Sequence, residues 1–148
     1  MKAYTKEKLR EFHQQFSSDD QVLVVISADP DAIASALAVS RLLAGRTAGV
    51  TLSNVNQINR PDNLAMIRLL KVPLTPFGDI PVERFGKMVV VDSQPNHGEA
   101  MTGLRPQVVI DHHPDGGYRA PFTDIRPNYG ATASILTEYL RAARITPA

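Results

Sequence analysis

Short apolar runs along this chain alternate with longer helical patterns. The runs, most of them continuous β-branched stretches typical of buried strands, predict strands at 22–26, 49–52, 88–91 and 108–110. Apolar and small residues at helical spacing predict helices over 5–16, 31–43, 61–70 and about 130–144, with a Pro/Gly-rich connector and a short strand at 73–81. Strands that alternate with helices form βαβ units. The pattern therefore predicts an α/β fold, a mostly parallel, Rossmann-like sheet flanked by helices.

Acidic and imidazole side chains follow three of the predicted strands. Asp29 and Asp31 come after the first strand, Asp92 ends another, and residues 111–113, Asp-His-His, end the last. The carboxyl ends of parallel strands lie along one edge of a sheet, and ligands bind beyond that edge. The sequence therefore gathers these groups in one candidate site.

The pair Asp29 and Asp31 has two interpretations. Aspartate is a good helix N-cap, so one of the pair could simply cap the following helix. Capping does not account for two aspartates at the mouth of an apolar strand, because like charges so close repel unless a cation lies between them. The pair therefore indicates a cation site.

The histidine pair also has two interpretations. His112 and His113 could be turn histidines, just as Asp92 alone could be a turn former. Imidazole and carboxylate together, however, suit manganese, zinc, iron or cobalt. One histidine would then ligate the metal while its neighbour meets a phosphate, and Asp111 would orient the ligating imidazole.

Composition narrows the function further. With 148 residues we expect a single domain, 1–148. The absence of cysteine excludes thiolate ligands and nucleophiles, and a net charge of +1 gives no attraction to long nucleic acid. No apolar run approaches a membrane span and no signal peptide is evident, so a cytoplasmic location without membrane contact is expected.

Together these motifs resemble those of the DHH phosphoesterase superfamily, in order and in spacing. Residues 29–36 resemble its first motif, 90–93 its second, and 111–113 the triplet that names it. The superfamily includes RecJ-type exonucleases, oligoribonuclease/pAp phosphatases, family II pyrophosphatases and exopolyphosphatases. The resemblance covers most of the chain, from about residue 22 to residue 140.

The resemblance implies a role for each matched residue. Asp29, Asp31, Asp92 and His112 would bind two Mn²⁺ ions, with Mg²⁺ or Co²⁺ as alternatives, and Asp92 would bridge the two. His113 would contact the phosphate, so that Asp92, His112 and His113 form the catalytic group. The ions would polarise the phosphoryl group and activate a bridging water.

The sequence departs from the family in two places. Members usually carry a histidine shortly before the first aspartate, where this chain has Val25, which cannot ligate. His97, on the loop after Asp92, could substitute or could simply be solvated. Members also continue into a further aspartate motif and a C-terminal substrate-binding domain, so the chain is expected to be a fragment or a minimal member.

Several alternatives remain open for substrate and activity. Thr132 begins the last helix, whose first amides could hold an anion, or it could be a plain N-cap. The expected substrates are short oligonucleotides or pAp-like nucleotides, with polyphosphate next, and a homodimer is the candidate assembly. The rival function is a non-catalytic nucleotide- or metal-binding module. A metal-free nucleotide site is excluded, because Asp29 and Asp31 would repel phosphate.

Overall fold

The computed structural model describes residues 2–146, so Met1 and 147–148, which the predicted domain included, lie outside the described residues. The helices are α1 (Lys2–Gln14), α2 (Pro30–Leu43), α3 (Pro61–Leu70) and α4 (Thr132–Ala142). The strands are β1 (Gln21–Ile26), β2 (Gly49–Asn54), β3 (Leu74–Pro76), β4 (Lys87–Val91), β5 (Val108–Asp111) and β6 (Phe122–Ile125). The described part contains no helix that is long and apolar enough to cross a membrane.

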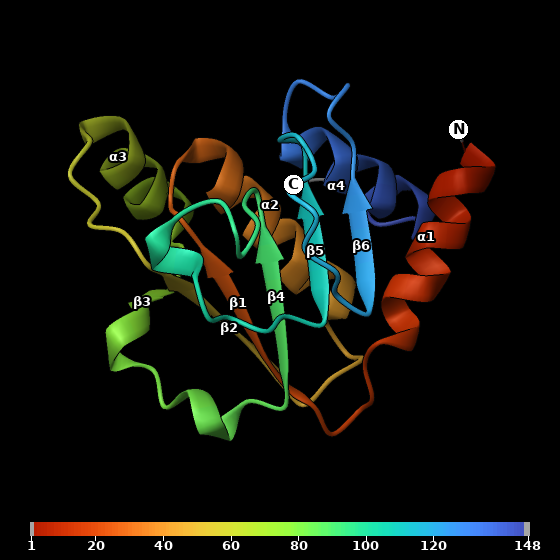
Figure 1. Cartoon of the computed structure of the whole chain (residues 1–148), viewed down its shortest axis with the longest axis horizontal. Helices are drawn as coiled ribbons and strands as arrows, with labels where there is room; N and C mark the ends of the chain where they lie inside the picture. Colours follow the sequence, from red (N-terminus) through yellow and green to blue (C-terminus); the bar gives the residue numbers. More distant parts are fainter. Residues whose placement is uncertain (1, 147–148) are drawn as a thin grey trace.

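The six strands form one sheet in the order β3-β2-β1-β4-β5-β6, and every pair is parallel. The predicted α/β class is confirmed, and the sheet is wholly rather than mostly parallel. Figure 1 shows the arrowheads of β4, β5 and β6 at the same edge. The chain runs outward from β1 to β3, then returns to start β4 on the other side of β1. This reversal makes the β1–β4 boundary the switch point where α/β sheets bind ligands.

The two faces of the sheet are covered differently. The main core packs β1, β4 and β5 residues such as Val24, Val89 and Ile110 with residues of α1, α2 and α4. On the other face, Leu23, Val25 and Val90 form a smaller cluster with Met101. Short 3-10 turns and loops cover that face in place of helices. All four α-helices of the described residues therefore pack on one side of the sheet. Figure 1 shows α2 and α4 behind the strands and α1 beside β6.

The first helix rests on the last elements of the chain. Phe12 of α1 is fully buried, and its ring centroid lies 6.0 Å from those of Phe122 in β6 and Tyr139 in α4. The Thr5 hydroxyl donates to Glu138 of α4 at 2.8 Å. The N-terminal helix is thereby fixed to the C-terminal end of the fold.

A buried ion pair joins β6 to α4. Arg126 donates two hydrogen bonds to Asp124, at 2.9 and 2.8 Å, and a third to Glu138 at 3.0 Å. The Tyr139 hydroxyl donates to Asp124 at 2.6 Å. Because both carboxylate oxygens have donors, the buried charge of Asp124 is compensated. The pattern analysis missed β6, whose polar residues obtain these partners only in the fold.

Candidate metal centre

A hollow of about 690 Å³ opens at the carboxyl edge of the sheet, beyond the ends of β1 and β4. Its lining comes from the β1–α2 turn, the loop after β4 and the loop after β5, and includes Ser27, Asp29, Asp92, Asn96, His97 and His113. Three segments that are distant in sequence therefore meet at the switch point.

The first two aspartates each cap a helix. Asp29 is the N-cap of α2, and its Oδ1 accepts the backbone N–H of Ala32 at 2.8 Å. Asp31, in the first turn of the same helix, accepts the backbone N–H groups of Thr132 and Ala133 at 3.0 and 2.7 Å. Asp31 therefore caps α4, a partner 101 residues away in sequence. Capping accounts for part of the role of both residues, and it fixes Asp29 at the hollow and Asp31 beside His112.

Asp92 lies in a strained and buried position. Its φ of 60° is left-handed, a conformation that aspartate tolerates better than most residues and that often marks functional sites. Burial raises its pKa to about 8, with the negative charges of Asp31 and Asp29 as further causes. The charges of Asp31 and Asp29 thus disfavour ionisation of Asp92, and a bound cation would relieve the repulsion.

Thr132 contacts Asp92 rather than the solvent. It was expected to bind substrate or to cap α4, but its side chain is fully buried, and its hydroxyl donates to Asp92 Oδ1 at 3.0 Å. The N-cap of α4 is Ala131. Thr132 thus orients the Asp92 carboxylate.

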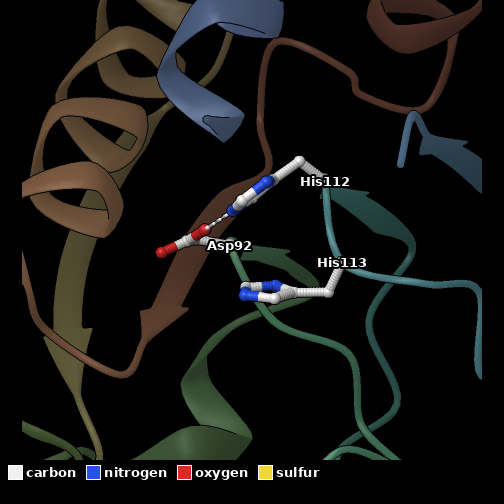
Figure 2. Close-up of side chains that lie close together, drawn as sticks. All are labelled: Asp92, His112 and His113. Carbon is white, nitrogen blue, oxygen red and sulfur yellow. Dashed lines mark ion pairs between the residues drawn. The ribbon is translucent and has the colours of Figure 1, made fainter. Parts of the chain in front are cut away.

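His112 directs one ring nitrogen towards the carboxylates. Its Nδ1 lies 3.1 Å from the carbonyl oxygen of Tyr129. A carbonyl can only accept, so Nδ1 carries the proton and a neutral ring has its lone pair on Nε2. That Nε2 lies 3.6 Å from Asp31 and 3.5 Å from Asp92. Figure 2 shows the Asp92 and His112 side chains pointing toward one another from the ends of β4 and β5.

Asp111 serves the other histidine. The sequence suggested that it orients the ligating imidazole, yet its Oδ1 lies 2.7 Å from Nδ1 of His113, while His112 offers it only a backbone N–H, at 2.9 Å. Asp111 is fully buried, and its second oxygen accepts a hydrogen bond from Gln94 at 2.8 Å. The bond to Asp111 leaves Nε2 of His113 available to the hollow.

The donor set suits a divalent transition metal. Asp92, His112 and His113 each offer an atom within 4.8 Å of the others. Ligand atoms held about 2.1 Å from a common ion lie roughly 3–3.5 Å apart. The distances from His112 to Asp31 and Asp92 are close to that spacing and too long for hydrogen bonds. The geometry therefore fits an ion between these groups.

The structure also places Val25 and His97, the residues that bear on the missing family histidine. Val25 is fully buried in the cluster on the helix-free face of the sheet. His97 lines the hollow, with its ring centroid 6.4 Å from that of His113. An imidazole absent from β1 therefore has a possible replacement from the loop after β4.

Sequence reasoning missed Gln94 and the Tyr129 carbonyl. Gln94 is fully buried: besides Asp111, it donates to the carbonyl of Pro114 at 3.2 Å and accepts the N–H of Gly116 at 2.9 Å. It therefore joins the loops after β4 and β5. A buried glutamine beside a site aspartate carries no motif, and a backbone carbonyl has no sequence signature.

Comparison with known proteins agrees with this geometry. Residues 21–147 match the model of the DHH family, N-terminal domain, whose members are in general metal-dependent phosphoesterases. The chain is also 33% identical over 140 residues to the uncharacterized protein MJ1633 of Methanocaldococcus jannaschii. That alignment covers 95% of this chain but only 29% of the relative, so the chain spans less than a third of the relative's length.

Proposed function

This chain belongs to the DHH family, and on that premise we propose that it is a metal-dependent phosphoesterase acting on short oligonucleotides or pAp-like nucleotides. The observation that carries the proposal is that Asp92, His112 and His113 each offer a ligand atom within 4.8 Å of the others. Asp92 and His113 line one hollow together with Asp29, and Asp31 lies 3.6 Å from His112. Such a set of donors suits a divalent cation, and a hollow of about 690 Å³ is large enough for a phosphate as well.

Each residue has a part in this function. Asp29, Asp31, Asp92 and His112 would hold the metal, Mn²⁺ being our expectation, with His97 as a further donor. When bound there, a divalent ion would supply charge to polarise a phosphoryl oxygen and to lower the pKa of water. The Asp111–His113 hydrogen bond keeps the His113 ring facing the hollow, where Nε2 can donate to a phosphate oxygen once protonated.

A non-catalytic metal- or nucleotide-binding module is the second candidate. The supporting observation is Val25, a buried hydrophobic residue at a position where the family usually has a ligand. Without that imidazole the first ion would bind more weakly, and binding could persist without turnover. Polyphosphate hydrolysis is the alternative within the enzyme class.

Calorimetry of metal-stripped protein with Mn²⁺ tests the site first. We compare the parent with Asp92→Asn and with Asp79→Asn, a control that neutralises an exposed carboxylate. Loss of one outer-shell partner weakens metal binding about 10–100-fold, so losing Asp92 should cost at least about tenfold. Asp79→Asn should bind like the parent. Absence of Mn²⁺ binding in the parent would overturn the proposed site.

Hydrolysis of pAp and of a short oligonucleotide then separates the two functions. A phosphoesterase turns over one or both with Mn²⁺ and loses that turnover in Asp92→Asn. Tight Mn²⁺ binding without hydrolysis would favour the non-catalytic module. Hydrolysis of polyphosphate but of neither nucleotide would instead indicate polyphosphate as the substrate.

A further inference from the structure

A second hollow, of about 320 Å³, lies at the same edge of the sheet, beyond the ends of β2 and β3. It is lined by two strand-end loops and by the loop after β4, with Asn54, Asn56, Gln57, Phe77 and Ala100 among the lining residues. Its volume is at the lower end of the about 300–1,000 Å³ typical of ligand pockets. It is therefore large enough for one small ring system.

The lining of this hollow is uncharged. No lining residue is acidic, basic or histidine; the lining includes three amide residues, Asn54, Asn56 and Gln57, and one aromatic residue, Phe77. The first hollow, by contrast, is lined by carboxylates and imidazoles. An uncharged, amide-bearing site does not attract phosphate or metal, but it suits a flat heterocycle with hydrogen-bonding edges.

We infer that this second hollow binds the base of a nucleotide whose phosphate lies in the metal centre. The inference rests on the proposed phosphoesterase function and narrows its substrate to nucleotides, as opposed to polyphosphate. Phe77 supplies a stacking face, and the amide of Gln57 supplies a donor and an acceptor for the edge of the base.

The residues of the second hollow suit the binding of a base: Phe77 is held in place, and the Gln57 side chain is available to bond. Phe77 is partly buried and packs against the cluster on the helix-free face, so its ring is a supported platform. Gln57 is exposed, and its side chain makes no hydrogen bond within the described residues. The Asn54 amide donates to the Asn56 carbonyl at 2.8 Å, which holds the floor of the hollow.

Two connections tie this hollow to the metal centre. The Asn56 side chain accepts the N–H of Ala28 at 2.7 Å and donates to its carbonyl at 3.0 Å, directly beside Asp29. The segment 93–101 lines both hollows, through Asn96 and His97 in one and Ala100 in the other. The strands whose ends form the two hollows, β3, β2, β1 and β4, are successive neighbours in the sheet, each about 4.8 Å from the next. One nucleotide can therefore extend from one hollow to the other.

The test compares a substrate that has a base with one that lacks a nucleobase, namely pAp and p-nitrophenyl phosphate. Phe77→Leu keeps an apolar side chain but removes the stacking face, and Gln57→Ala removes the edge contact. Gln14→Ala, an exposed glutamine on α1, is the control. Stacking contributes about 1–3 kcal/mol per base, so Phe77→Leu should raise the KM for pAp about tenfold, and Gln57→Ala by a few-fold. Rates with p-nitrophenyl phosphate should not change.

A binding measurement keeps the inference separate from catalysis. The fluorescence of 2-aminopurine riboside monophosphate should be quenched on binding to the parent, and the quenching should be lost in Phe77→Leu. Equal losses on both substrates, or an unchanged KM for pAp in both variants, would overturn the inference. If the parent hydrolyses neither substrate, the proposed function fails, and the quenching experiment alone tests the base site. Quenching in the parent that is lost in Phe77→Leu would support the base site. Absence of quenching in the parent would refute it.

Discussion

Replacing Asp92 by asparagine should make the metal-free protein more stable while abolishing its response to metal. Asparagine also tolerates the left-handed backbone found at this position, φ 60°, and can still accept the hydrogen bond from Thr132. The substitution therefore removes a negative charge with little change of shape. Alanine would be a poorer probe, because it would add backbone strain and leave Thr132 without its partner.

The size of the effect follows from the pKa of Asp92, which burial and the charges of Asp31 and Asp29 raise from 3.8 to about 8. Because the folded pKa lies above the unfolded one, the folded protein binds this proton more tightly. The associated stability is present below pH 3.8 and is lost as the pH rises through 8. At about 1.4 kcal/mol per pH unit, the ceiling is about 6 kcal/mol. Side-chain relaxation lowers it, and we expect about 2–3 kcal/mol, or about 5–10 °C in Tm.

Urea unfolding after chelation, followed by far-UV circular dichroism at pH 5 and pH 8, measures this difference. At pH 8 metal-free Asp92→Asn should be the more stable protein, and at pH 5 the difference should shrink. Mn²⁺ at 1,000 times the parent's Kd should reverse the order, since it adds about 4.1 kcal/mol to the parent and nothing to a variant that no longer binds it. Asp79→Asn should follow the parent throughout. The reasoning would be refuted if the difference in free energy of unfolding between the two proteins did not change with pH, or if Asp92→Asn were the less stable protein at pH 8.

Two further predictions concern the loops around the metal centre. Gln94→Leu should lower the free energy of unfolding by about 1–3 kcal/mol in urea titrations, because it leaves buried polar partners unsatisfied; an equal effect from the exposed control Gln14→Leu would contradict this. Gly116→Ala places a Cβ 2.8 Å from side-chain atoms of Asn96 and His97. Because both side chains are exposed and can move, the free energy of unfolding should change by less than about 1 kcal/mol. Calorimetry should nevertheless show severalfold weaker pAp binding, because the displaced side chains belong to the loop that lines the first hollow. Gly130→Ala, which meets nothing within 4 Å, should leave both unchanged, and an unaffected pAp affinity in Gly116→Ala would show that the two loops do not act together.

The strands that the sequence predicted correctly are those whose burial is evident from their own residues. Val89, Val90 and Val91 of β4 are all fully buried, and such a run has few alternatives to a central parallel strand. Strand β6 was missed because Thr123 and Asp124 suggest a loop. Asp124 can be buried because Arg126 and Tyr139 of α4 donate hydrogen bonds to it. These are tertiary contacts, which the order of hydrophobic and polar residues does not reveal.

The candidate site was predictable in its members but not in their pairing. Parallel topology alone brings Asp29, Asp92 and His112 to one edge. Which group orients which ring depends on loop conformations: the partner of His112 is the Tyr129 carbonyl, and Asp111 turns to His113. The capping of α4 by Asp31 likewise joins elements 101 residues apart.

The contact between the first and last helices has a consequence for how the chain reaches its fold. Residue 5 of α1 bonds to residue 138 of α4, so the two partners are 133 residues apart. During synthesis α1 leaves the ribosome before β6 and α4, so Phe12 lacks two of its aromatic partners, Phe122 and Tyr139, until those elements have emerged. Contacts of such long sequence separation slow folding and prolong the exposure of apolar surface. We therefore expect α1 to dock on β6 and α4 late in folding, and the apolar side that carries Phe12 to be open to aggregation or chaperone capture in the interval before.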